Sequence, residues 1–158
     1  MIEIRIATPS DKEILVEALF QMLIETDKDQ FPSDVLPTKA NAEVLYAMSV
    51  ESAVGHGDPV LIAYDGSDIC GAIAVCIRRG GLELKRKCAF GCGLFIWPKY
   101  RNFGITRKFM KIVDAMLRIA GVSVWEEAIF CGNVFPQAAV NAHGFTHSMR
   151  VYRKLLQP

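Results

Sequence analysis

The order of apolar and polar residues predicts a strand and two helices at the start of the chain. Residues 2–6 alternate apolar and charged side chains, which is typical of a half-buried strand. Residues 8–11 have the composition of a helix start, and apolar residues then recur at helical spacing to about Glu25. Residues 26–37 are polar with two prolines and predict a loop. Residues 38–54 predict a second helix, with Ala42, Leu45, Tyr46, Met48 and Ser49 on roughly one side.

The middle of the chain has the pattern of neighbouring strands. Residues 60–64 form a short apolar run, and residues 65–68, Asp-Gly-Ser-Asp, predict a hairpin turn. Residues 69–78 are mostly apolar and rich in β-branched side chains, so we expect a central strand there. After a bend, residues 82–87 are consistent with either a short strand or a solvated excursion.

A further strand and a long helix follow. Residues 88–97 predict a strand, in which Gly91 and Gly93 indicate a bulge or the close approach of another backbone. Residues 104–120 predict an amphipathic helix that ends at Gly121. Its apolar stripe is core-facing and consists of Ile105, Phe109, Ile112, Val113, Met116, Leu117 and Ala120.

The last part of the chain completes the alternation of strands and helices. Residues 122–131 predict a strand, and residues 136–143 predict a short helix that ends at Gly144. Residues 145–156 predict a terminal strand or a bent hairpin. Because the chain contains no internal repeat, low-complexity segment or linker, we expect one α/β domain over residues 1–158.

Composition excludes several classes of protein. The 158 residues are 51% hydrophobic and 22% charged, which suits one globular domain with a real core. The N-terminus lacks a basic segment followed by an apolar one, and the longest apolar run, near residues 70–77, is too short to cross a bilayer. We therefore expect a cytoplasmic protein without a membrane partner.

The net charge of +1 hides an asymmetry between the two halves of the chain. Residues 1–77 hold 4 Lys and Arg against 13 Asp and Glu, a net charge of −9. Residues 78–158 hold 14 against 4, a net charge of +10. Either the basic half binds a polyanionic ligand, or the two halves pack together and neutralise each other.

The five cysteines favour buried, reduced thiols over a metal site or a disulfide framework. Their number is odd, and no two of them form a C-x-x-C pair. Cys70 and Cys76, like Cys88 and Cys92, are separated by an even number of positions, so in strands each pair would share a face. The three histidines are scattered, and we expect no metal.

Residues 96–106, which join the strand at 88–97 to the long helix, are a candidate anion-binding turn. The start of a helix has unpaired N–H groups and a partial positive charge, and both stabilise an anion. Gly104 allows a ligand to approach the backbone without a Cβ in the way, while Arg101 and Arg107 add permanent charge. An ordinary strand-to-helix turn is the alternative.

The order of elements and two motifs resemble the GNAT superfamily of N-acetyltransferases, whose fold is a mixed, mostly antiparallel sheet flanked by helices. The acyl-CoA motif of that family reads roughly V-x-P-x-Y-R-x-x-G-[IV]-[GA]. Residues 96–105, Ile-Trp-Pro-Lys-Tyr-Arg-Asn-Phe-Gly-Ile, fit it, and the sequence departs at Thr106, where a small residue is usual. A second pattern, an Asn followed by a distant Gly-Phe, fits Asn133 and residues 144–145.

The resemblance implies that acetyl-CoA is the acyl donor and that this turn binds it. Arg101 belongs to the motif, and backbone N–H groups would cradle the pyrophosphate, namely those of Asn102, Phe103, Gly104, Ile105, Thr106 and Arg107. Phe95 and Ile96 would offer backbone hydrogen bonds to the pantetheine arm, in a strand splayed from its neighbour, and Asn133 would hold the arm from the other side. The side chain of Thr106 needs room or could itself bond to a phosphate.

The catalytic groups cannot be assigned from the sequence. Many family members have a tyrosine acid five residues before the Phe of Gly-Phe, but here that position is Val140. No carboxylate lies in residues 89–96, where Cys92 is the titratable group. Glu83, Glu126 and Glu127 are nearby in sequence but suit solvated surface, and Tyr100 is usually structural in this motif. Tyr152 lies on the predicted last strand, and the sequence does not decide whether its side chain reaches the cleft.

The prediction is therefore an acetyl-CoA-dependent N-acyltransferase without an assigned acid or base. The acceptor, a small molecule or a protein amine, would enter over the loop between the first two helices. Glu25, Asp27, Asp29 and Asp34 there would favour a cationic amine, unless they form only a solvated loop. The alternatives are a catalytically silent GNAT-like domain that binds CoA or a partner and, more weakly, nucleic-acid binding or modification. A homodimer is compatible with the sequence.

Overall fold

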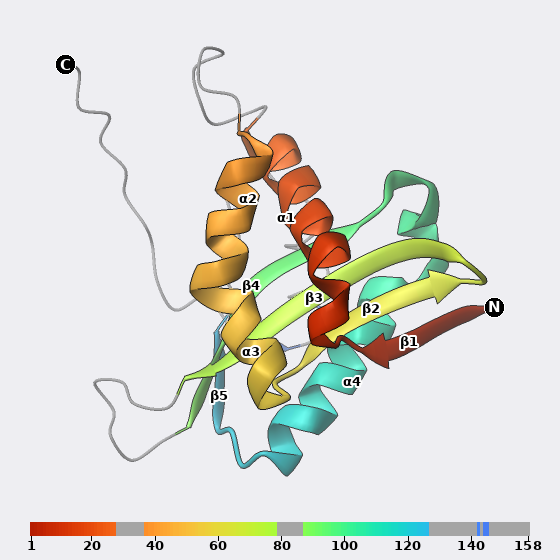
Figure 1. Ribbon diagram of the computed structural model, residues 1–158. Helices are drawn as coiled ribbons and strands as arrows, with labels where there is room; N and C mark the ends of the chain where they lie inside the picture. The colour runs from red at the N-terminus through yellow and green to blue at the C-terminus, as the bar shows by residue number, and fades with distance from the viewer. Residues whose placement is uncertain (28–36, 79–86, 127–141, 143, 146–158) are drawn as a thin grey trace.

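A computed structural model describes residues 1–27, 37–78, 87–126, 142, 144 and 145 of the chain. Within these residues one sheet has the strand order β1-β2-β3-β4-β5 (Figure 1). Its strands are β1 (Ile2–Ile6), β2 (Val60–Asp65), β3 (Asp68–Arg78), β4 (Cys88–Ile96) and β5 (Val124–Glu126). The first four strands pair in antiparallel fashion and β4 pairs with β5 in parallel, so the expected mixed, mostly antiparallel sheet is confirmed.

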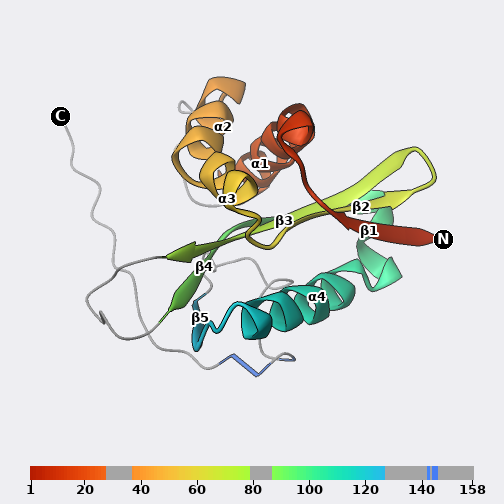
Figure 2. The same ribbon diagram turned by 60° about the horizontal axis from the view of Figure 1, so that its bottom comes forward.

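Helices cover both faces of the sheet. One layer contains α1 (Lys12–Asp27), α2 (Lys39–Leu45), the π-helical segment η2 (Tyr46–Val50) and α3 (Glu51–His56). The opposite face carries α4 (Ile105–Ile119), as Figure 2 shows. Two short 3-10 helices, η1 (Pro9–Asp11) and η3 (Pro98–Phe103), precede α1 and α4. The sheet therefore separates two hydrophobic cores.

The alternation of side chains along β3 assigns residues to the two cores. Ala72 and Ala74 face α1 to α3, where they pack with residues such as Leu19 and Tyr46. Ile73 and Val75 face α4, whose stripe includes the fully buried Phe109 and Val113. The predicted core face of the long helix is confirmed, with Ile105 and Leu117 at its ends.

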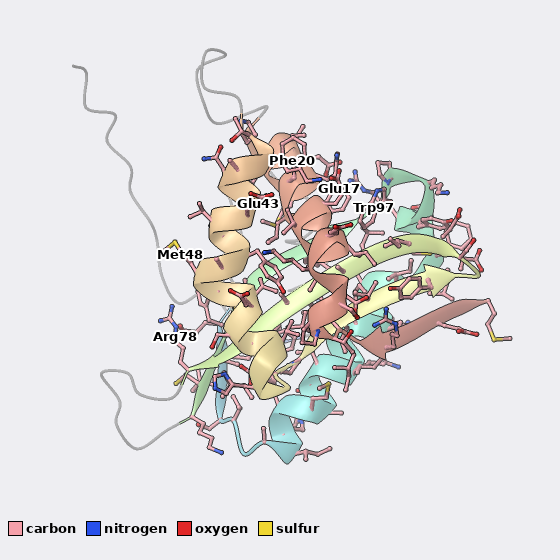
Figure 3. The ribbon with its side chains drawn as sticks, in the orientation of Figure 1. Glu17, Phe20, Glu43, Met48, Arg78 and Trp97 are labelled. Carbon is pink, nitrogen blue, oxygen red and sulfur yellow. A yellow bond between two sulfur atoms is a disulfide. The ribbon has the colours of Figure 1, made fainter. Side chains whose placement is uncertain are left out.

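The second predicted helix is divided, and its apolar face differs from the expected one. The buried residues Ala42, Tyr46 and Val50 recur every four positions, and the π-helical segment accommodates that spacing. Leu45 and Met48, expected on the same side, are exposed at 37% and 75%, and Met48 points away from the sheet (Figure 3).

Two bulges correct the prediction made for the cysteines. In β3, Ala63 pairs with Gly71 but Tyr64 pairs with Ile69, so Cys70 is an extra residue. As a result Cys70 packs in the core against α4, whereas Cys76 packs against the α1 side. The even spacing of this pair therefore does not place the two thiols on one face.

The second bulge carries a disulfide that the sequence analysis did not expect. Val75 pairs with Gly91 and Ala74 with Gly93, which leaves Cys92 as the extra residue of β4. This confirms the bulge expected from the two glycines. Cys76 and Cys92 form a disulfide across the neighbouring strands, with their Cα atoms 6.6 Å apart. The expectation of reduced thiols is wrong for this pair, because the bulge turns Cys92 toward Cys76 on the same face.

The remaining predicted elements are only partly described. The β2–β3 turn is confirmed, with Gly66 at φ +62°. Ala142 is helical and Gly144 has φ +80°, as expected at the end of a helix. The predictions for residues 79–86, 127–141 and 146–158 lie outside the described residues, and a single domain over residues 1–158 stays a prediction. No helix in the described part of the chain is both long and apolar enough to cross a membrane.

Candidate functional site

Residues 97–107 fold into a turn that presents the start of α4. Pro98 opens η3, and the N–H of Tyr100 donates to the carbonyl of Trp97 at 2.8 Å. Gly104 then takes the left-handed conformation, φ +69° and ψ +19°, between η3 and α4. A Cβ at Gly104 would meet no atom within 4 Å, so the glycine is required by its backbone conformation and not by crowding.

The first turn of α4 has the donors that an anion needs. Lys108 N donates to Gly104 O at 3.2 Å, so the N–H groups of Ile105, Thr106 and Arg107 precede the first helical hydrogen bond. No side chain caps this end, and the first turn of α4 contains no acidic residue. Arg107 and Lys108 are exposed beside it. The turn therefore offers backbone donors, the positive end of a helix dipole and free surface to a phosphate.

The structure shows where the Thr106 side chain finds room. Thr106 is only 7% exposed, so most of its side chain packs into the protein. The fold therefore accommodates the departure from the family motif at this position.

Arg101 does not present its charge to the front of the turn. One terminal nitrogen pairs with Glu25 Oε1 at 2.5 Å, and Nε donates to the carbonyl of Ile96 at 3.1 Å. The guanidinium also lies over the ring of Phe95, 5.8 Å from its centroid. We call the ion pair the Glu25–Arg101 bridge. It joins two residues that the sequence analysis assigned to different tasks, one to the phosphates and one to a cationic acceptor.

At the end of β4 next to this turn, the backbone groups of successive residues face opposite sides of the strand. Trp97 N donates to Cys70 O on β3 at 3.0 Å, and backbone groups alternate sides along a strand. The N–H and C=O of Ile96 therefore face away from β3, whereas those of Phe95 face toward it. Within the described residues β5 pairs with β4 only at Cys88, Ala89 and Phe90. This leaves the Ile96 end of the edge without a described strand partner.

Beside this edge lies a small apolar hollow between α1 and the sheet. It holds about 20 Å³, room for about one water molecule. Leu19 and Met22 of α1 lie close to Gly93, where a Cβ would come within 3.1 Å of Leu19 Cδ2. The residues that line it all have apolar side chains or none: Leu15, Ala18, Leu19, Met22, Val50, Ala72, Ile73, Ala74, Gly93, Leu94 and Phe95. The hollow therefore provides neither an acid nor a base.

The candidate catalytic groups are only partly placed. Tyr100 is 7% exposed and its hydroxyl donates to Asp68 at 3.0 Å, which is a structural role. Cys92 is in the disulfide, and Glu126 is exposed at the end of β5. Asn133, Val140, Glu83, Glu127 and Tyr152 lie outside the described residues, as do Asp29 and Asp34. The described part of the chain contains no group of three His, Cys, Asp or Glu placed to hold a metal ion.

Comparison with known proteins gives matches in structure but not in sequence. No protein-family model and no curated protein matches the chain. A GCN5-related N-acetyltransferase from Ralstonia eutropha matches with a TM-score of 0.76 and 14% identity, over 98% of this chain and 99% of that one. A predicted acetyltransferase from Clostridium acetobutylicum, solved with acetyl-CoA, has a TM-score of 0.75 and 12% identity, with 98% and 96% covered.

An aminoglycoside N-acetyltransferase has the same fold. AAC(6')-Iy, in complex with the bisubstrate analogue CoA-S-monomethyl-acetylneamine, matches with a TM-score of 0.66 and 20% identity, over 99% of each chain. At these identities the matches establish the fold. The chain has the fold of the GCN5-related N-acetyltransferases, and the resemblance inferred from its motifs is confirmed at that level.

Proposed function

We propose that the protein is an N-acyltransferase that moves the acetyl group of acetyl-CoA to an amine. The observation that carries this proposal is the turn at Gly104, where the N–H groups of Ile105, Thr106 and Arg107 have no acceptor within the helix and lie at the positive end of α4, beside the exposed side chains of Arg107 and Lys108. Neighbours of the same fold were solved with acetyl-CoA or CoA, which supports this ligand over another anion.

The residues of the turn and of β4 fit acetyl-CoA. The three N–H groups bind the pyrophosphate, and the exposed Arg107 and Lys108 add positive charge beside it. The N–H of Ile96 faces the edge of β4 and donates to the pantetheine arm, which assigns to Ile96 the role that the sequence analysis divided between Phe95 and Ile96. Asn102 and Phe103, both exposed, border the same surface. Asn133 stays a predicted partner of the arm.

Acetyl-CoA, when bound, supplies an acyl group already activated as a thioester. The chain must then orient the amine and accept its proton, since an alkylamine has a pKa of about 10.4. A thiol has a pKa of about 8.5, so a thiolate leaves without a dedicated acid, and Val140 at the usual tyrosine position is compatible with turnover. The apolar hollow between α1 and β4 limits water near the reaction.

The acidic helix layer supports a cationic acceptor. Together α1, α2 and α3 carry more acidic than basic side chains, and Glu17 and Glu43 belong to adjacent helices (Figure 3). Two of the structural matches are complexes of the aminoglycoside acetyltransferase AAC(6')-Iy. Aminoglycosides and polyamines are therefore the first acceptors to screen by release of free thiol.

A catalytically silent CoA-binding domain is the second candidate. The observation that favours it is the absence of any titratable side chain among the residues that line the described hollow, together with the disulfide at Cys92. Both candidates bind acetyl-CoA, but only the enzyme releases thiol when an amine is supplied.

Calorimetric titration with acetyl-CoA tests the cofactor site. We expect micromolar binding that is lost in Gly104→Asp, because the new carboxylate would repel the pyrophosphate at the helix start. Gly57→Asp is the matched control, since Gly57 has φ +71° and equally open space but caps α3 on the other layer. Equal loss in both variants, or no binding by the wild type at millimolar ligand, would contradict the proposed site.

A further inference from the structure

The Glu25–Arg101 bridge fixes one peptide group at the end of β4. The carbonyl of Ile96 accepts from Arg101 Nε at 3.1 Å, and the N–H of Trp97 donates to Cys70 O at 3.0 Å. The Ile96 carbonyl and the Trp97 N–H belong to the same peptide group, so hydrogen bonds hold this peptide group from both sides. Its orientation constrains ψ of Ile96, the torsion that relates this peptide group to the preceding one, which carries the Ile96 N–H on the open edge.

Within α1 alone, the position of Glu25 is electrostatically unfavourable. Glu25 lies in the last turn of α1, where a negative charge faces the negative end of the helix dipole. No basic residue lies in that turn to compensate it. The charge of Glu25 is compensated instead by Arg101, which comes from the turn at the other side of the candidate site. The described ion-pair partner of Glu25 is therefore Arg101 and not a residue of its own helix.

The geometry of arginine suits this double role. The guanidinium uses one nitrogen for Glu25 and another for the Ile96 carbonyl, and its planar fork fixes their relative directions. The two side chains are 34% and 35% exposed, so the pair is neither fully screened nor fully desolvated. A lysine would keep the charge but could not hold both partners in this way.

We propose that Glu25 and Arg101 are positioning residues for the cofactor arm, and that the bridge holds the Ile96 N–H toward the pantetheine of acyl-CoA. This inference rests on the proposed function. It removes Glu25 from the residues that attract a cationic acceptor, because its carboxylate is already paired. It also makes the acceptor-side helix α1 part of cofactor recognition.

Binding of two ligands distinguishes a role in positioning the pantetheine arm from a general loss of structure. Acetyl-CoA contains the pantetheine arm, whereas adenosine 3′,5′-bisphosphate contains the nucleotide and lacks the arm. We expect Glu25→Ala to weaken acetyl-CoA binding about fivefold, near the upper end for a half-exposed ion pair, and to leave bisphosphate binding unchanged. Asp114→Ala is the matched control, because it removes an exposed Arg–carboxylate pair on α4 with the same change in net charge.

A double-variant cycle tests whether the effect passes through Arg101. We expect Arg101→Lys to weaken acetyl-CoA binding in the wild-type background and to have a smaller effect when Glu25 is already alanine. Additive effects of the two substitutions on acetyl-CoA binding would show that Glu25 does not act through Arg101.

The outcomes keep the two proposals distinguishable. Unchanged acetyl-CoA binding in Glu25→Ala would overturn the positioning role and leave the proposed function standing. Equal weakening for both ligands with a lowered melting temperature would show a purely structural pair and also overturn it. A wild-type protein that binds neither ligand would remove the proposed function, and the positioning role with it.

Discussion

Asp11 is 4% exposed, and its carboxylate accepts four hydrogen bonds. Two come from the guanidinium of Arg5, at 2.8 and 2.7 Å, and two come from the N–H and hydroxyl of Thr8, at 2.8 and 2.9 Å. The bonds from Arg5, followed by those from Thr8, hold the pKa of Asp11 well below its ordinary value despite burial. This single residue attaches the start of the first helix layer to the edge strand β1.

Replacing this carboxylate should therefore cost stability in a pH-dependent way. We expect Asp11→Asn to lower the free energy of unfolding by about 2 kcal/mol at pH 7, because it removes hydrogen bonds to a charged group. Since the folded pKa lies below the ordinary 3.8, the contribution is complete above that value and is lost as the pH falls toward the folded pKa. Urea unfolding of both proteins at pH 7 and at pH 3 measures the difference.

The control for this prediction is Asp114→Asn, which alters an exposed pair on α4. Its effect should stay below about 1 kcal/mol. A gap between wild type and Asp11→Asn that stays constant down to pH 2 would contradict the charged role of Asp11.

The elements that surround the candidate site are distorted where β4 carries its bulge. The disulfide Cys76–Cys92 ties β3 to β4 at that bulge, and Gly93 beside it admits Leu19 and Met22 of α1. The open edge that ends at Ile96 begins just beyond this region. The disulfide and the close helix contact thus hold the strand that the cofactor arm is proposed to follow.

Reduction of this disulfide should weaken the fold without abolishing it. The bond closes a loop with a sequence separation of 16, for which the loss in stability is about 3 kcal/mol. We expect a reductant to lower the urea midpoint of the wild type and to have little effect on Cys76→Ser/Cys92→Ser. Alkylation before and after reduction, followed by peptide mass analysis, checks the pairing directly. Full alkylation of Cys76 and Cys92 without reductant would contradict it.

At this scale the sequence predicts regular elements better than irregular ones. The stripe of α4 and the turn at Gly104 follow from periodicity and from a glycine at a helix start, both of which are local signals. The face of Cys70 and the pairing of Cys76 do not, because a one-residue bulge inverts every side chain beyond it. The Glu25–Arg101 bridge joins residues 76 positions apart, so no local pattern indicates it.

In the whole molecule the acidic helices α1 to α3 and the basic helix α4 lie on opposite faces of the sheet. The helices α1 to α3 form one layer, and α4 forms the layer on the other face (Figure 2). Arg107, Lys108, Lys111 and Arg118 of α4 are exposed. Two described ion pairs join residues 1–77 to residues 78–158, namely Glu25–Arg101 and Asp68–Lys99. The Glu25–Arg101 bridge is one described contact between them, and it lies at the candidate cofactor turn. This arrangement favours a polyanionic ligand on the basic layer and a cationic one on the acidic layer.

Binding of acetyl-CoA should raise the free energy of unfolding of the protein. A ligand that binds only the folded state, at 100 times its dissociation constant, raises the free energy of unfolding by about 2.7 kcal/mol. We expect acetyl-CoA at that concentration to raise the melting temperature of the wild type and of Gly57→Asp, and to leave Gly104→Asp unchanged. Because the ligand is a polyanion, the shift should shrink as salt is added at constant ligand concentration. A shift of equal size in Gly104→Asp would place the ligand away from the start of α4, on a surface that the turn does not form.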